Sequence, residues 1–216
     1  MVTLLAGTRP RSVLDVGAGT GFFSRQLLAR DHVASATCVD PGYDADRDEW
    51  IDGKPLLFRR SMTRPGADLV LLMDVLEHVA DDGALLRSCV RAVDGGTRFI
   101  VTVPAFSWLW SGHDVFLGHH RRYTLNQIRG VVERSGLVIE DTCYLYGALF
   151  PLAAASRLLG RLRAAVTGRH GARSQMRLCG RLANGALWAA CRAELLMFRH
   201  NRLFGLTAMV IARKAA

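Results

Sequence analysis

The feature that most constrains the fold of this sequence is a regular alternation of short, apolar, β-rich runs with helical patterns. The alternation covers roughly the first two thirds of the 216 residues. Strands and helices that alternate in this way build a parallel sheet from strand–helix–strand units. Six strands are expected, at residues 12–16, 35–40, 55–60, 67–73, 97–103 and 137–145. Helices are expected at residues 20–30, 81–93 and 124–136, the second capped by Asp81 or Asp82 and the third closed by Gly136.

The C-terminal third has a different character. Residues 147–204 show a helical and basic pattern, with a second helix expected at about 178–199, and residues 206–214 return to strand character. No linker separates this region from the rest. We therefore predict a single domain over residues 1–216, in which residues 147–204 form a helical insertion before a seventh strand.

Charge is divided unevenly along the chain. Residues 1–150 hold 16 Lys and Arg against 18 Asp and Glu, a net charge of −2, whereas residues 151–216 hold 12 against one, a net charge of +11. An anionic partner would therefore meet the C-terminal third. We predict that residues 147–204 act as a lid, as a homodimer interface or as an element that rests on an anionic membrane surface.

The cysteines and the apolar runs indicate the compartment. The five cysteines are an odd number with no Cys-x-x-Cys pair, which indicates reduced, buried thiols. The N-terminus has no secretory signal pattern, and the longest apolar runs fall short of the roughly 20 residues of a membrane span. We expect a cytoplasmic protein, peripheral on the inner membrane surface if the basic insertion binds lipid.

A glycine-rich turn follows the first expected strand, in the stretch "VLDVGAGTGFF". Its glycines are Gly17, Gly19 and Gly21, and position 22 is Phe, so the dinucleotide fingerprint G-x-G-x-x-G is not met. A phosphate-binding P-loop is excluded because no Gly-Lys-Ser/Thr follows. Glycine at such a strand tip lets a ligand approach the backbone closely.

Together with Asp15, this glycine spacing resembles the first motif of class I S-adenosylmethionine-dependent methyltransferases. Two further stretches resemble the same family: "CVDP", which places an acid at the end of the second strand, and "DLVLLMDVLEHV", at the fourth strand. The resemblance covers residues 12–145 and the last strand. It implies an α/β, Rossmann-like fold with a seven-stranded, mostly parallel sheet and an antiparallel last strand. The implied cofactor is S-adenosylmethionine, with S-adenosylhomocysteine as the product.

The resemblance also implies a set of cofactor-binding residues. Asp40 would accept hydrogen bonds from the ribose hydroxyls. Ser61 and Met62 occupy the position near adenine, where an acid is common in the family. The full expected set is Asp15, Gly17, Ala18, Gly19, Gly21, Asp40, Pro41, Ser61, Met62, Met73, Asp74 and Val75.

The stretch "SWLWSGHDVFLGHHRRYT", residues 107–124, concentrates the remaining chemistry. A metal site built from His113, Asp114, His119 and His120 matches no standard ligand spacing, because adjacent histidines point apart in an extended chain, and we expect no metal. A purely structural loop would be held by arginine–carboxylate and histidine–backbone hydrogen bonds, with Trp108 and Trp110 as packing anchors. A functional loop would place a histidine beside the transferring methyl group. These last two roles can coexist.

In the functional interpretation, a histidine acts as a general base for a hydroxyl or amine acceptor. The candidates are His113 and His119, with Asp114 orienting a ring, and His78 from "LEHV". The expected substrate-binding side chains are Trp110, Arg121, Arg122 and Tyr123.

The string "HDVFLGHHRRYT" resembles a branch of bacterial small-molecule methyltransferases. The predicted function is therefore methyl transfer to an O, N or C atom of a small amphipathic or anionic metabolite. An RNA methyltransferase is the alternative enzyme, supported only by the basic C-terminal region, and we expect no nucleic-acid partner. A non-catalytic, cofactor-binding partner protein is the alternative from another class.

Overall fold

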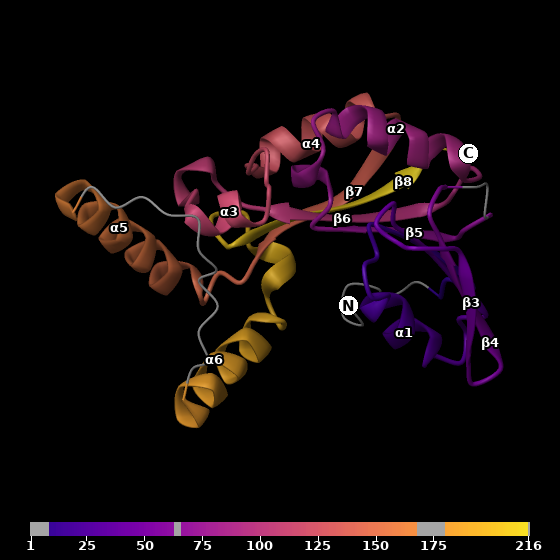
Figure 1. Cartoon of the computed structure of the whole chain (residues 1–216), viewed down its shortest axis with the longest axis horizontal. Helices are drawn as coiled ribbons and strands as arrows, with labels where there is room; N and C mark the ends of the chain where they lie inside the picture. Colours follow the sequence, from indigo (N-terminus) through magenta and orange to yellow (C-terminus); the bar gives the residue numbers. More distant parts are fainter. Residues whose placement is uncertain (1–8, 63–65, 168–179, 216) are drawn as a thin grey trace.

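The computed structural model describes residues 9–62, 66–167 and 180–215. Within these residues one eight-stranded sheet forms the centre of the molecule, in the order β3-β4-β2-β1-β5-β6-β8-β7 (Figure 1). The strands are β1 (Ser12–Val16), β2 (Ser35–Val39), β3 (Arg47–Ile51), β4 (Lys54–Arg59), β5 (Leu69–Met73), β6 (Arg98–Pro104), β7 (Leu137–Leu145) and β8 (Thr207–Lys214). All seven predicted strands are present.

Five adjacent strands are parallel, whereas β3 and β8 run in the opposite direction. β4, β2, β1, β5 and β6 run in one direction, whereas β8 lies antiparallel between β6 and β7. This confirms the predicted Rossmann-like sheet with an antiparallel last strand. The carboxyl ends of the parallel strands meet at one edge, where open α/β sheets bind their ligands.

The eighth strand, β3, corrects the predicted count of seven. It pairs antiparallel with β4 through a tight turn at Asp52 and Gly53, both with positive φ (51° and 76°). The sequence "RDEWI" does not look like a core strand because β3 is an edge strand with mostly exposed side chains. Its turn, Asp-Gly, is a typical hairpin signal that the prediction overlooked.

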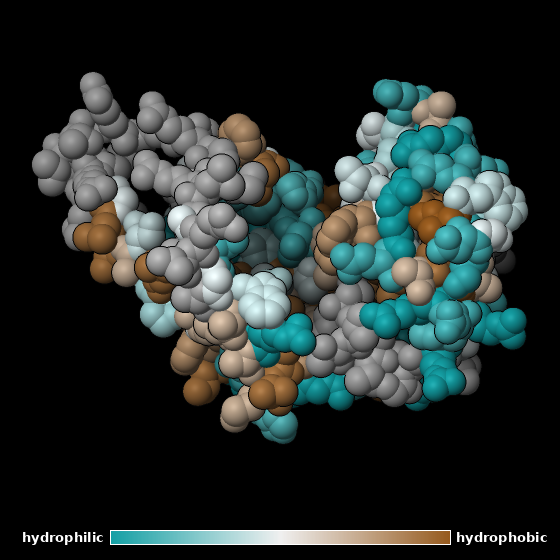
Figure 2. Space-filling model, turned by 90° about the horizontal axis from the view of Figure 1, so that it is seen from below, coloured by the Kyte–Doolittle hydropathy of each residue, from teal (hydrophilic) through white to brown (hydrophobic). Residues whose placement is uncertain are grey.

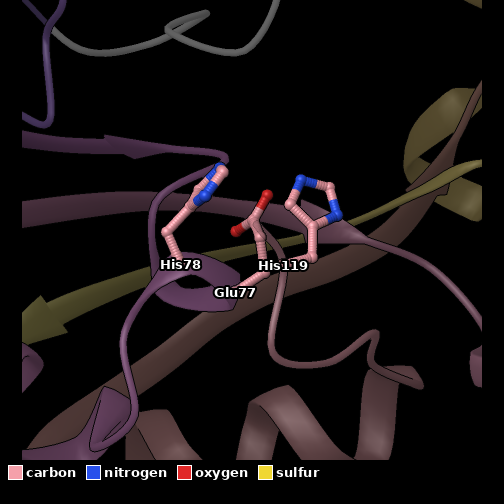
Figure 3. Close-up of side chains that lie close together, drawn as sticks. All are labelled: Glu77, His78 and His119. Carbon is pink, nitrogen blue, oxygen red and sulfur yellow. The ribbon is translucent and has the colours of Figure 1, made fainter. Parts of the chain in front are cut away.

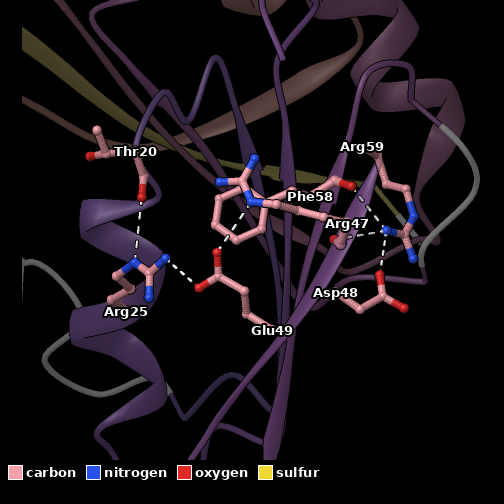
Figure 4. Close-up of polar contacts among 7 residues, drawn as sticks. All are labelled: Thr20, Arg25, Arg47, Asp48, Glu49, Phe58 and Arg59. Carbon is pink, nitrogen blue, oxygen red and sulfur yellow. Dashed lines mark hydrogen bonds and ion pairs between the residues drawn. The ribbon is translucent and has the colours of Figure 1, made fainter. Parts of the chain in front are cut away.

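Polar contacts tie the β3–β4 hairpin to the helix after the glycine turn (Figure 4). Arg25 Nη2 donates to Glu49 Oε2 at 2.5 Å, and its Nε donates to the carbonyl oxygen of Thr20 at 3.4 Å. Arg47 also bonds Glu49, and its guanidinium lies 3.8 Å from the centre of the Phe58 ring. These contacts connect the hairpin to the first helix, α1 (Phe22–Leu28).

Helices cover both faces of the sheet. α2 (Asp82–Ala92) and α4 (Leu125–Arg134) lie on one face and α1 on the other (Figure 1). Asp81 is the N-cap of α2, because its side chain accepts a hydrogen bond from Ala84 N. α4 starts with a reciprocal capping box between Thr124 and Gln127. Two apolar clusters, one on each face, form the core.

Between β7 and β8 the chain leaves the sheet as two helices, α5 (Phe150–Thr167) and α6 (Arg181–Glu194), followed by the short helix η3 (Phe198–His200). We call these three elements the helical arm; α5 and α6 extend away from the sheet in Figure 1. α6 lies within the predicted helix 178–199, whose first two residues fall outside the described residues.

The helical arm and the segment after it present apolar side chains to solvent. Figure 2 shows apolar residues on the side of the molecule that carries the helical arm. A hollow separates this side from the rest of the molecule. The exposed apolar residues here are Leu152, Leu158, Leu159, Trp188, Leu195, Leu196, Met197, Leu203 and Phe204. No helix in the described ranges is both long enough and apolar enough to span a bilayer.

Candidate active site at the carboxyl edge of the sheet

The glycine turn between β1 and α1 has three residues in the left-handed region, Gly17, Gly19 and Gly21, with φ of 69°, 52° and 73°. A Cβ at Gly17 would lie 2.6 Å from Val75 Cγ2, and one at Gly21 would lie 3.2 Å from Cys38 Sγ. A Cβ at Gly19 would meet no protein atom within 4 Å. Packing against Val75 therefore requires glycine at position 17, the space at Gly21 is tight, and Gly19 faces open space.

Asp40 follows β2 and faces this turn. Its Oδ2 accepts a hydrogen bond from Gly19 N at 3.0 Å, and its Oδ1 accepts one from Gly42 N at 2.8 Å. Pro41 is exposed beside it, and Ala18 is partly exposed in the turn. The structure thus places the predicted ribose-binding acid next to the open glycine, while its contact with a cofactor stays a prediction.

Asp15 lies beneath the turn with 1% of its surface exposed. Its Oδ2 accepts a hydrogen bond from Ser24 Oγ of α1 at 2.9 Å. Burial raises the pKa of Asp15 to about 6, although the bond from Ser24 acts in the opposite direction. The carboxyl group therefore ties β1 to α1, and contact with a cofactor stays a prediction for Asp15 too.

The end of β5 forms the wall of a pocket. Asp74 has a positive φ of 55°, its N donates to the carbonyl oxygen of Thr102 at 3.1 Å, and Thr102 Oγ1 donates to Asp74 Oδ1 at 3.2 Å. The pocket encloses about 170 Å³. Its lining includes Phe23, Met73, Asp74, Thr102, Tyr146 and Phe198. Of the predicted adenine-side residues, Ser61 is exposed and Met62 packs against the core.

The histidine-rich stretch folds around one buried carboxylate, that of Asp114. It contains the short helices η2 (Ser107–Leu109) and α3 (Gly112–Phe116). Asp114 is fully buried; its Oδ1 accepts from Arg122 Nε at 2.6 Å and bonds His119 Nδ1 at 3.0 Å. Its Oδ2 accepts from Ser111 N at 2.9 Å and lies 3.6 Å from Arg157 Nη1 of α5.

Asp114 is therefore ionised at neutral pH. Burial alone would raise its pKa, but the hydrogen bond and the charge of Arg122, helped by His119 and Ser111, hold the pKa of Asp114 below its ordinary value. Because an ionised carboxylate can only accept, His119 Nδ1 carries the proton of their shared bond. In the neutral form of the imidazole, Nε2 of His119 has the lone pair.

The basic and aromatic residues that end this stretch contact the protein itself. Arg121 donates to the carbonyl oxygen of Ala80, and Arg122 donates to that of Ala105 as well as to Asp114. Tyr123 is 3% exposed and donates its hydroxyl to Asp82 Oδ2 at 2.8 Å. These contacts favour the loop-holding role. Substrate binding stays a prediction for Arg121, Arg122, Tyr123 and the partly exposed Trp110.

The structure brings two of the predicted histidines together with an acid that the sequence reasoning missed. Glu77 and His78 lie in the short helix η1 (Leu76–His78) just after β5, and His119 comes from the loop after α3. Figure 3 shows the Glu77 carboxylate between the two imidazole rings. The spacing Asp74, Glu77, His78 after a strand was an available signal, because residues three and four apart share one face of a helical turn.

Burial controls the charges of this cluster. Burial, with a contribution from the nearby Asp74, raises the pKa of Glu77 to about 8. Partial burial lowers the pKa of His78, and His119 acts in the same direction. The pKa of His113 is also lowered, by burial and then by Arg157, but the ring of His113 stacks with Phe116 and is not part of the cluster.

Comparison with known proteins identifies the family of the chain. Residues 2–142 match the family described as "Methyltransferase domain". The chain belongs to this methyltransferase family. A curated relative, the ubiquinone biosynthesis O-methyltransferase of Nitrosomonas europaea, is 31% identical over 112 residues, 46% of this chain and 47% of the relative. The chain thus spans about half the length of the curated relatives it matches.

Solved methyltransferases share the fold. A putative methyltransferase from Bacillus halodurans C-125 has a TM-score of 0.55 at 11% identity and covers all of this chain and 97% of its own. The Haemonchus contortus phosphoethanolamine N-methyltransferase 2, solved in complex with S-adenosyl-L-methionine, has a TM-score of 0.53 at 15% identity. It covers 95% of this chain and 49% of its own. At such identities the likeness concerns the fold alone.

Proposed function

We propose that this chain is an S-adenosylmethionine-dependent methyltransferase that methylates a hydroxyl oxygen of a small amphipathic molecule. The observation that carries the proposal is the direct packing of the glycine turn on the end of β5: Gly17 has room for no Cβ because Val75, next to Asp74, fills the space. The candidate cofactor turn and the Asp74 pocket are therefore adjacent at the carboxyl edge of the sheet.

The cofactor would lie across this edge. Asp40 would bind the ribose beside Gly19, the turn residue that faces open space. Met73 and Asp74 would lie at the methionine end, because both line the pocket. The neighbour solved with S-adenosyl-L-methionine supports the choice of cofactor.

The pocket supports an acceptor with an apolar body. Phe23, Leu145 and Phe198 are among its lining residues, with Asp74 and Thr102 as polar groups at one wall. Relatives named ubiquinone biosynthesis O-methyltransferase support an oxygen acceptor. An apolar molecule with a hydroxyl group fits both features.

The chemical step needs alignment and the loss of one proton. The acceptor oxygen forms a bond to the methyl carbon while the carbon–sulfur bond breaks, and the electron pair of that bond stays on sulfur to give neutral S-adenosylhomocysteine. The hydroxyl proton leaves the acceptor and reaches solvent. His78 and His119 lie close enough to Asp74 to interact with its charge, which puts two nitrogen bases near the pocket.

Calorimetric titration with S-adenosylmethionine and S-adenosylhomocysteine tests the cofactor site. The chain should bind one molecule of either ligand, and Asp40→Ala should weaken binding by about 10-fold to 100-fold, since charged hydrogen bonds contribute roughly 1.5 to 3 kcal/mol each. Asp44→Ala, an exposed acid in the same loop, is the matched control and should bind normally. Absence of binding at millimolar ligand would overturn the proposal.

Acceptor identity is tested by release of S-adenosylhomocysteine in a screen of phenols and aliphatic alcohols with apolar tails. Amines and RNA belong in the same screen. Turnover with RNA or with amines alone would contradict the oxygen-acceptor assignment.

A further inference from the structure

Glu77, His78 and His119 form a cluster of three metal-ligating side chains that the methyl-transfer proposal does not require as a set. One potential ligand atom from each lies within 4.8 Å of the other two. The residues come from η1 and from the loop after α3, and the backbone joins these segments, because His120 N donates to the carbonyl oxygen of Glu77 at 2.7 Å. The cluster is thus fixed by the fold.

To this cluster Glu77 contributes a buried oxygen atom that has no partner in the part of the chain that the structure describes. Its side chain is 1% exposed, and its Oε2 has no hydrogen-bond partner within the described residues. Figure 3 shows the carboxylate directed into the space between the two imidazoles. A buried carboxyl oxygen without a partner is costly, and a cation that displaces the proton of Glu77 would give this oxygen a partner.

His119 has the orientation of a metal ligand. The buried carboxylate of Asp114 accepts the Nδ1 proton of His119, and Arg122 fixes the carboxylate in turn. Such carboxylate–histidine pairs hold an imidazole rigid and leave Nε2 with its lone pair for a metal. His78 completes the set from an exposed position, which gives an ion access from solvent.

We propose that Glu77, His78 and His119 bind a divalent first-row transition-metal ion. Two imidazole nitrogens and one carboxylate oxygen suit such ions better than Mg²⁺ or Ca²⁺, which prefer oxygen ligands. Three protein ligands leave coordination positions open, as in catalytic metal sites.

The use of this ion in catalysis rests on the proposed function. Held by Glu77, His78 and His119, the ion would act as a Lewis acid that lowers the pKa of an acceptor hydroxyl bound to it, and the hydroxyl proton would leave to solvent. The substrate class narrows accordingly to molecules with a hydroxyl that can bind a metal, such as catechols and other phenols.

Metal binding is testable without turnover. The chelator-treated full chain is titrated calorimetrically with Mn²⁺, Co²⁺, Zn²⁺ and Mg²⁺, and Co²⁺ binding is followed by its visible absorption. We expect one transition-metal ion per chain and much weaker Mg²⁺ binding. Glu77→Gln and His119→Gln should each weaken binding at least 10-fold. His120→Gln, the exposed neighbouring histidine outside the cluster, should bind as the unmodified chain does.

His78→Gln is the variant least expected to unfold the chain, because His78 is exposed and its substitution leaves the core intact. Weaker metal binding by this variant would therefore report the loss of a ligand. Metal affinity that is unchanged in both His78→Gln and Glu77→Gln would overturn the inference, as would no binding at millimolar metal. Titration with S-adenosylmethionine separates the two proposals: cofactor binding without metal binding overturns the metal site alone, and metal binding without cofactor binding overturns the proposed function alone.

Discussion

Asp15 holds a proton at a pH where most aspartates are ionised, because the carboxyl group is buried beneath the glycine turn and its pKa is raised from 3.8 to about 6. The folded chain therefore binds this proton more tightly than the unfolded chain does. The resulting stabilisation is complete below pH 3.8 and is lost as the pH rises through about 6.

Asp15→Asn should remove this pH dependence. Between pH 5 and pH 7.5 the free energy of unfolding of the unmodified chain should fall relative to that of the variant by about 1.4 kcal/mol, the equivalent of one pKa unit. Urea unfolding of both proteins at the two pH values measures the difference. Asp44→Asn, at an exposed site, should show no such change. A pH-independent difference between Asp15→Asn and the unmodified chain would contradict the raised pKa.

For single residues, the sequence predicts a feature when the residue type alone determines it. It does not predict a feature that depends on which side chains another segment brings close. The glycine turn after β1 follows from the motif, and the structure adds that all three glycines have positive φ. The unpaired oxygen of Glu77 does not follow from the sequence, because it depends on which side chains a distant loop supplies. The bond between His119 and Asp114 joins residues only five apart, but their spacing in the sequence does not show which ring nitrogen makes the bond.

The β3–β4 hairpin illustrates the same division at the scale of elements. Seven strands were predictable because each contains a run of apolar or β-branched residues, which is continuous in buried central strands and interrupted by exposed residues in β7. β3 was not predicted because its side chains are mostly exposed and charged. Its hydrogen bonds to β4, and not burial, make it a strand. The Asp52–Gly53 turn is the local signal that determines it.

Gly53→Ala should destabilise the fold by about 1 kcal/mol, since a non-glycine residue in the left-handed region costs roughly 1 to 2 kcal/mol. A Cβ at Gly53 would meet no atom within 4 Å, so the cost comes from the backbone at φ 76°. Gly130→Ala in α4 is the control and should stabilise the fold, because alanine has a higher helix propensity than glycine. Denaturant unfolding measures both. Equal stability of the unmodified chain and Gly53→Ala would contradict the turn geometry.

At the scale of the whole molecule, the helical arm combines exposed leucines with the net charge of +11 carried by residues 151–216. In each predicted role of the arm, as a lid, a dimer interface or a membrane-surface element, these exposed side chains would contact another surface. An anionic bilayer matches both properties, because each basic residue near it contributes about 1 kcal/mol.

Flotation with vesicles tests this role. We expect the chain to float with anionic vesicles, to stay behind with neutral ones, and to be released by high salt. The double variant Leu158→Glu, Leu159→Glu should bind weakly, whereas Trp50→Glu, which alters an exposed side chain on β3 at the opposite edge of the sheet, should bind normally. A dimer by light scattering with no flotation would instead favour the interface between copies.

The position of β8 has a consequence for the synthesis of the protein. β8 lies between β6 and β7, yet the whole helical arm precedes it in the chain. Until the ribosome has made β8, β7 has no neighbour in the sheet and the edge of β6 stays open to other chains. A nascent chain that stalls in the arm would therefore be a client for chaperones, and β7 can join the sheet only after translation has passed Lys214, the last residue of β8.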